Sequence, residues 1–246
     1  MPKVQYIDPY LSRKAGQLDF KPIPVNQYQK TVKDEKGNFT NEEFKAIYHD
    51  MELIREFETM LNLIKIRGEY NGIPYNHPGP AHLSIGQEAA AVGMAYTLDV
   101  DDFIFGSHRS HGEILAKCLS AIDKMDEADL VPILESYMEG EAYQIVKEHF
   151  PGNDAKDMAQ NFIIYGTLAE IYAKRTGFNG GLGGSMHTFF APFGSMPNNA
   201  IVGGSGTIAF GSALYKKVNR KKGIVIANVG DGSMSRGPIW EALNMS

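Results

Sequence analysis

The fold is decided by one stretch near the end of the chain, Gly223-Ile224-Val225-Ile226-Ala227-Asn228-Val229, followed directly by Gly230-Asp231-Gly232-Ser233. Its apolar run, bounded by glycines, predicts a buried strand over residues 223–229. Such a strand places Asp231 at the carboxyl-terminal edge of a sheet, where open α/β sheets bind ligands. The adjoining glycines let backbone N–H groups approach an anion, and one carboxylate beside a diphosphate is sufficient for partial Mg²⁺ ligation. Gly-Asp-Gly is also a common turn, so both interpretations stay open at this point.

Helices and strands alternate upstream of this stretch. Apolar residues at spacings of three and four predict a long helix from Asn41 to near Gly68, and Phe103-Ile104-Phe105 is typical of a short strand. Further helices are expected over residues 89–96, from Glu113 onward, over 162–174 and over 205–219. This alternation predicts an α/β fold in which a parallel sheet is covered by helices on both faces.

The predicted sheet is expected to be incomplete at the C-terminus. The chain reaches its last residue, Ser246, in a predicted helix soon after Asp231. We therefore expect the remaining strands to be supplied from elsewhere. An incomplete sheet exposes an edge and apolar surface, so association of the chain with itself or with a partner is expected.

Composition excludes several classes of protein. The 246 residues carry a net charge of −5, with 43% hydrophobic and 22% charged residues, as in an ordinary globular protein and unlike a nucleic-acid-binding one. Cys118 is the only cysteine, which excludes a disulfide framework within the chain. No signal peptide or membrane-spanning stretch is evident. We expect a cytoplasmic protein that binds neither nucleic acid nor membrane.

The chain is expected to consist of an extended N-terminal arm over residues 1–40 and one domain over 41–246. A disordered tail is the alternative for residues 1–40. Residues 123–157 contain ten acidic residues and three lysines. We interpret the segment from about 123 to 165 as an exposed helical insertion with a solvated acidic face, in preference to an interaction surface.

Two further patterns carry chemistry of their own. Residues 204–209, Gly-Ser-Gly-Thr-Ile-Ala, match the loose dinucleotide pattern GxGxxA, which requires a strand immediately before it. The preceding residues contain Pro197 and two asparagines and make a poor strand, so close helix packing explains these glycines better. Arg109, flanked by His108 and His111, offers a planar cation suited to diphosphate oxygens, although a surface loop of this composition is equally ordinary.

Five segments in order resemble one known family over most of the chain from about Asn41. They are HLSIGQEAA at 82–90, DDFIFGSHRSHG at 101–112, GGLGGSMH at 180–187, NNAIVGGSG at 198–206 and VGDGSMSRGPIWEALNMS at 229–246. This succession resembles the α subunit of the thiamine diphosphate-dependent decarboxylating component of 2-oxo acid dehydrogenase complexes. The acetoin dehydrogenase α subunit is similar in the same places.

The resemblance implies catalytic roles for two histidines and a diphosphate contact for one arginine. His82 opens the family's HxxxGQE segment, which lies near substrate and cofactor. In the family's Tyr-Arg-x-His segment, the arginine corresponds to Arg109 and the final histidine to His111. The tyrosine is replaced by His108, so the resemblance implies a histidine at the position of that cofactor contact.

The remaining implied contacts are to the aminopyrimidine ring and to Mg²⁺. Backbone groups at Ala200 and Val202 correspond to those that hold the ring, and Ala200 replaces a glycine of the family pattern. Asp231 corresponds to the Mg²⁺-binding aspartate, with Gly232 and Ser233 beside the diphosphate. The family's second metal-binding asparagine would fall beyond Ser246, and Asn244 lies too early to replace it.

The resemblance also implies a reaction and a set of partners. The cofactor adds to a small 2-oxo acid, CO₂ is lost, and the acyl group passes to a lipoyl-bearing acyltransferase. A β subunit or fused β domain supplies the glutamate that activates the cofactor, so this chain alone is expected to be inactive. Acetoin cleavage is an alternative of similar chemistry. A nicotinamide dinucleotide-binding domain or a non-catalytic assembly paralogue are alternatives of another class.

Overall fold

The computed structural model describes residues 8–10, 13–16, 22, 24–25, 27–77 and 79–246. The chain divides into two compact units, Met1–Glu43 and Phe44–Ser246. In the first unit, the described residues before Asn41 form turns, bends and irregular segments, without a helix or a strand. The predicted arm over 1–40 lies partly outside the described residues and stays a prediction.

Helix α1 (Asn41–Arg67) begins with a capping box. The Thr40 N–H donates to Glu43 Oε2 over 2.7 Å, and the Glu43 N–H donates to Thr40 Oγ1 over 3.1 Å. The buried face of the helix carries its apolar residues at spacings of three and four, Ile54, Phe57, Leu61 and Ile64. The helix predicted from Asn41 to near Gly68 is therefore confirmed.

A short hairpin follows α1. Strand β1 (Glu69–Tyr70) pairs antiparallel with β2 (Ile73–Pro74). The two residues between them, Asn71 and Gly72, have φ of 49° and 77°. Both φ angles are positive, as a type I′ hairpin turn requires, and Asn-Gly is the residue pair that adopts such angles most readily.

The main sheet has three parallel strands in the order β4-β3-β5. Central β3 (Phe103–Phe105) pairs with β4 (Ser195–Met196) on one side and with β5 (Val225–Ala227) on the other. This confirms the predicted α/β fold with a parallel sheet. The strand predicted as buried over 223–229 is shorter than expected and only half-buried, because β5 lies at the edge of the sheet and is paired on one side.

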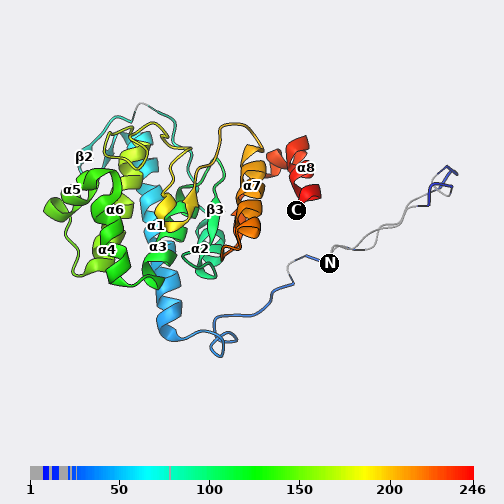
Figure 1. Cartoon of the computed structure of the whole chain (residues 1–246), viewed down its shortest axis with the longest axis horizontal. Coiled ribbons are helices and arrows are strands. Elements are labelled where there is room, and N and C mark those ends of the chain that lie inside the picture. The colour runs from blue at the N-terminus through cyan, green and yellow to red at the C-terminus, as the bar shows by residue number, and fades with distance from the viewer. Residues whose placement is uncertain (1–7, 11–12, 17–21, 23, 26, 78) are drawn as a thin grey trace. The chain divides into compact units, whose positions relative to one another are not determined.

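Most of the core is helical. Helices α2 (Glu88–Tyr96), α3 (His111–Lys124), α4 (Glu127–Ser136), α5 (Glu141–His149) and α6 (Ala155–Ile171) pack with α1 around one apolar cluster. Short 3₁₀ turns lie at Tyr137–Gly140 (η1) and Ala191–Phe193 (η2). In Figure 1, strand β3 lies between helices α4–α6 on one side and the last two helices, α7 (Gly204–Val218) and α8 (Gly237–Met245), on the other.

The acidic segment from 123 to 165 is helical, as expected, but it is not an exposed appendage. Six of its apolar side chains are fully buried in the main core: Leu130, Leu134, Val146, Ala159, Phe162 and Ile163. Eight of its ten acidic residues are exposed, and the other two are half-buried. The helices are amphipathic, so a solvated acidic face and a core-forming face coexist. Whether the segment is an insertion relative to the family stays a prediction.

The glycine pattern at 204–209 opens helix α7, and no strand precedes it directly. The last strand before it, β4, ends at Met196, and residues 197–203 form a loop. A Cβ on Gly206 would collide with the Ile239 side chain of α8, and one on Gly204 would lie 2.6 Å from the Asn199 amide. These glycines therefore serve close packing, as the sequence indicated. Among the described residues, no helix is long and apolar enough to cross a membrane.

Candidate functional site

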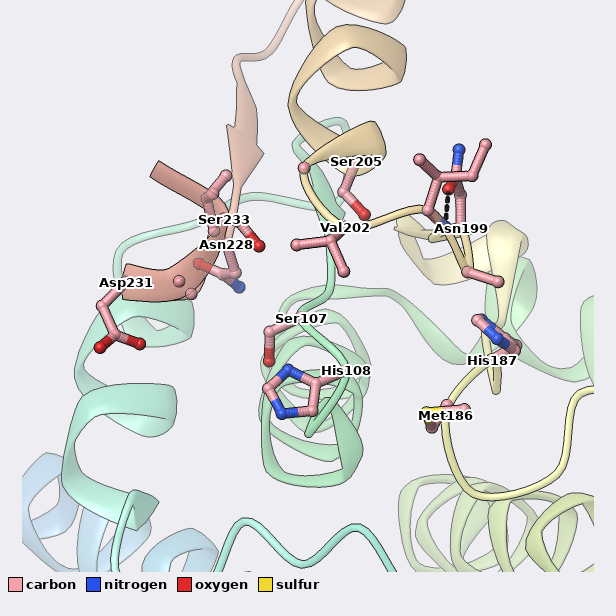
Figure 2. Close-up of a pocket in the computed structure, with 16 residues that line it drawn as sticks. Ser107, His108, Met186, His187, Asn199, Val202, Ser205, Asn228, Asp231 and Ser233 are labelled. Atoms are coloured by element: carbon pink, nitrogen blue, oxygen red, sulfur yellow. Dashed lines mark hydrogen bonds between the residues drawn. The ribbon is translucent and has the colours of Figure 1, made fainter. Parts of the chain in front are cut away.

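A cavity of about 340 Å³ lies where the carboxyl ends of β3 and β5 meet the loop before α7. Four segments far apart in the chain line it: the loop after β3, the loop with Met186 and His187, the loop 199–203 with the start of α7, and the turn after β5 (Figure 2). Of the predicted site residues, six line this cavity: His108, Ala200, Val202, Asp231, Gly232 and Ser233. His82, Arg109 and His111 do not. The cavity lies at the strand ends that parallel sheets use for ligands, and its volume is typical of small-molecule sites.

The turn after β5 presents Asp231 with room on both sides. It forms a short 3₁₀ turn, η3 (Asp231–Ser235). A Cβ built on Gly230 or on Gly232 would meet no atom within 4 Å, so both glycines leave open space beside the backbone. The carboxylate of Asp231 is exposed, and Ser233 adds a hydroxyl. This combination of a carboxylate, a hydroxyl and approachable backbone fits an anionic ligand together with a cation.

The loop after β3 is held by Glu113 in the first turn of α3. Glu113 Oε2 accepts from the Ser107 N–H over 2.8 Å, and burial raises the pKa of this carboxyl. Gly106 packs so closely that a Cβ there would lie 2.6 Å from Ser110 Cβ. The anchored loop carries His108 into the cavity wall, while the guanidinium of Arg109 donates to the Leu83 carbonyl over 3.0 Å.

A buried polar network lies beneath the site. The His111 ring is fully buried, with Nδ1 2.9 Å from Glu58 Oε1 and Nε2 2.7 Å from the Ser185 carbonyl. Glu58 Oε2 also accepts from the Ser84 N–H over 2.7 Å, and the Ser185 hydroxyl accepts from the His82 N–H over 2.9 Å. The network joins α1, α3 and two loops. His111 is thus placed where it can position these loops, out of reach of the cavity.

His82 lies between the network and the cavity. Its ring meets that of His108 edge to face, with centroids 6.5 Å apart. Burial lowers the pKa of His82, and the nearby Arg109 charge lowers it further. Among the described residues, its buried Nδ1 has no hydrogen-bond partner. A neutral imidazole with an unused buried nitrogen is thereby held next to the cavity.

Sequence reasoning missed His187 and Asn198. His187 lines the cavity, and its Nδ1 lies 2.8 Å from Asn198 Oδ1. Both residues fall inside the segments 180–187 and 198–206 that carried the family resemblance. The pairing itself was not visible, because it depends on how two glycine-rich loops fold over each other.

The described residues contain no cluster of three or more His, Cys, Asp or Glu side chains that could hold a metal ion. Of the described residues that line the cavity, Asp231 is the single carboxylate. A divalent cation at this place would therefore need ligands from a bound phosphate or from water in addition to Asp231.

Comparison with known proteins agrees with this geometry. The family model for the dehydrogenase E1 component matches residues 74–131 and 134–246. The α subunit of acetoin:2,6-dichlorophenolindophenol oxidoreductase from Bacillus subtilis is 31% identical over 217 residues, which are 88% of this chain and 50% of that protein. The α subunit of the pyruvate dehydrogenase E1 component from Rhizobium meliloti is 26% identical over 210 residues, covering 85% of this chain and 46% of the relative.

The chain thus spans about half the length of the curated relatives that it matches. The matched region contains every segment of the cavity wall, from the loop after β3 to the turn after β5. Because the family model covers well over half of its residues, this chain belongs to the dehydrogenase E1 component family.

Proposed function

We propose that this chain is the α part of a thiamine diphosphate-dependent E1 component that decarboxylates a small 2-oxo acid and passes the acyl group to a lipoyl carrier. The observation that carries the proposal is the cavity at the ends of β3 and β5, with Asp231 and two open glycine positions on its wall. The named relatives, a pyruvate dehydrogenase E1 subunit and an acetoin oxidoreductase subunit, support the same class of chemistry.

The proposed contacts follow from the cavity wall. Asp231 would hold Mg²⁺, and Gly232 with Ser233 would hold the diphosphate. Main-chain groups of Ala200 and Val202 would contact the aminopyrimidine ring. A main-chain contact tolerates alanine at position 200, because Ala200 still offers its backbone N–H and carbonyl.

Three predicted site residues act from outside the cavity lining in this proposal. Arg109 would exchange its Leu83 carbonyl for a diphosphate oxygen, which is the stronger, charge-assisted partner. His82 would lie beside the substrate through its contact with His108, and His111 would position the loops through Glu58 and Ser185. His111 is therefore assigned a positioning role in place of direct contact with the reacting atoms.

The bound cofactor supplies a nucleophilic carbon and an electron sink for the bond that breaks. The residues of this chain bind and orient that cofactor, and they limit its access to water. We further propose that a β subunit or β domain completes the active site, and that a lipoyl-bearing acyltransferase takes the product. Acetoin cleavage is the second candidate, favoured by the higher identity to the acetoin oxidoreductase subunit.

The proposal is tested by calorimetric titration of thiamine diphosphate, with and without Mg²⁺, into the full-length chain assembled with its β part. We expect binding that requires Mg²⁺ and weakens at least about tenfold in Asp231→Asn, because the carboxylate is lost. Asp129→Asn, on the exposed face of α4, is the matched control and should bind as the unmodified protein does. Uptake of a nicotinamide dinucleotide in place of thiamine diphosphate would show that the assignment is wrong.

A further inference from the structure

The hydrogen-bonded pair His187 and Asn198 at the cavity makes none of the proposed cofactor contacts. Asn198 donates through Nδ2 to two backbone carbonyls, those of Ser107 at 3.0 Å and Met186 at 2.7 Å. Carbonyl oxygens only accept, so the amide nitrogen must face them and Oδ1 must face His187. His187 Nδ1, 2.8 Å from that oxygen, must then carry a hydrogen and donate it. Asn198 therefore selects one tautomer of His187.

The other ring nitrogen of His187 is left for a ligand. No residue in the described part of the chain hydrogen-bonds Nε2. The side chain is half-buried and lines the cavity. Because Nδ1 keeps its hydrogen in both protonation states, Nε2 is the atom at which the ring accepts a hydrogen bond when neutral and donates one when protonated.

His187 lies on the side of the cavity opposite to Asp231 (Figure 2). In Figure 2, Asp231 and Ser233 lie on one side of the cavity, His187 and Met186 lie on the opposite side, and His108 lies between them. A ligand whose phosphates occupy the Asp231 side would place its non-phosphate end toward His187. His108 lines the same cavity as His187, and His82 lies within electrostatic reach of His187. Neither of these two side chains is acidic.

We propose that His187 is a substrate contact of this cavity, with Asn198 as its positioning residue. This inference rests on the proposed function. The expected ligand is a ketone that carries a hydroxyl or carboxylate group next to its carbonyl carbon. Neutral Nε2 accepts a hydrogen bond from the hydroxyl of a hydroxy ketone, and protonated Nε2 donates one to the carboxylate of a 2-oxo acid. Either substrate class would use the same atom.

The test uses the full-length chain assembled with its β part and loaded with thiamine diphosphate and Mg²⁺. Calorimetry measures the affinity for two analogues that lack the reactive ketone, lactate for the 2-oxo acid and 2,3-butanediol for acetoin. We expect the analogue that matches the natural substrate to bind about 10- to 100-fold more weakly to His187→Ala, as for one lost hydrogen bond to a charged or buried group. His187→Gln, which retains a hydrogen-bonding end, should recover part of this loss.

The variant Asn198→Ala tests whether Asn198 positions the His187 ring. It should weaken analogue binding less than His187→Ala does, and the double variant should bind no more weakly than His187→Ala alone, because the two residues act through one atom. His149→Ala is the matched control, since His149 is an exposed histidine that does not line the cavity. The affinity for thiamine diphosphate should stay within about twofold in all five variants.

The outcomes separate this inference from the proposed function. Retained thiamine diphosphate binding with unchanged affinity for both analogues in His187→Ala and His187→Gln would overturn the inference and leave the proposed function standing. Failure of the unmodified assembly to bind thiamine diphosphate would overturn both. Additive losses in the double variant would refute the positioning role of Asn198.

Discussion

The buried network around Glu58 leads to a pair of contrasting substitutions. Glu58 and His111 are both fully buried, and the Glu58 carboxylate serves His111 Nδ1 at 2.9 Å and the Ser84 N–H at 2.7 Å. Glu58→Ala leaves both partners without an acceptor and opens a cavity. Removal of one member of a buried pair costs about 3–5 kcal/mol of stability. Glu58→Gln offers an oxygen to the Ser84 N–H and keeps a hydrogen-bonding group beside His111 Nδ1, so its cost should be about 1 kcal/mol.

Thermal unfolding of the full-length chain, followed by circular dichroism, distinguishes the two variants. For a domain of this size, 3–5 kcal/mol corresponds to a fall in Tm of about 6–20 °C, whereas 1 kcal/mol corresponds to about 2–4 °C. Glu58→Ala should also weaken thiamine diphosphate binding, because the network holds the loops that carry His82 and Ser185. Equal falls in Tm for Ala and Gln, or a fall under about 2 °C for Ala, would refute the assignment of a shared buried network.

Three further predictions concern single positions. In urea unfolding, Gly166→Ala should lower the free energy of unfolding by about 1–3 kcal/mol, because the new Cβ would overlap the Phe178 ring. Gly211→Ala, at a helical position where a Cβ would meet nothing within 4 Å, should raise it by about 0.5–1 kcal/mol. Equal effects of the two substitutions would contradict the packing argument. Burial raises the pKa of Asp50 from 3.8 to about 6. The folded state therefore favours the protonated carboxyl, so the stability is fully present below pH 3.8 and falls as the pH rises through 6 and Asp50 ionises. Asp50→Asn should therefore gain about 1–2 kcal/mol relative to the unmodified chain between pH 4 and pH 7, and a gain independent of pH would contradict this. Burial raises the pKa of the Cys118 thiol to about 12, so a maleimide should label it only after unfolding; rapid labelling of the native protein would show that the thiol is accessible.

Local signals predicted the elements that form the fold. The capping residues and apolar spacing of α1, the apolar run of β3 and the small-residue helix α7 all appear close to their expected ranges. Each of these depends on residues that are near one another in the chain, so periodicity and end signals are sufficient to find them. The acidic segment shows the limit of this approach, because net charge does not reveal the buried face of an amphipathic helix.

The candidate site was predicted in its segments and only partly in its contacts. The turn with Asp231 and the loop with Ala200 and Val202 meet at one cavity, as the resemblance implied. Arg109 lies on the expected loop, but it donates to a backbone carbonyl outside the cavity. His111 opens helix α3 and is buried in the network. A motif gives a residue's place in the chain, whereas its side-chain direction depends on neighbours contributed by other elements.

The sequence by itself determined the family, the parallel α/β class and the segments that supply the site, because these are properties of residue order and local spacing. Only the tertiary structure decided that Glu58 and Ser185, 127 positions apart in the numbering, hold His111 from both sides, and that Asn198 selects the tautomer of His187. These roles arise from hydrogen bonds between distant segments. Such bonds form only when packing brings a donor and an acceptor together in a space that excludes water.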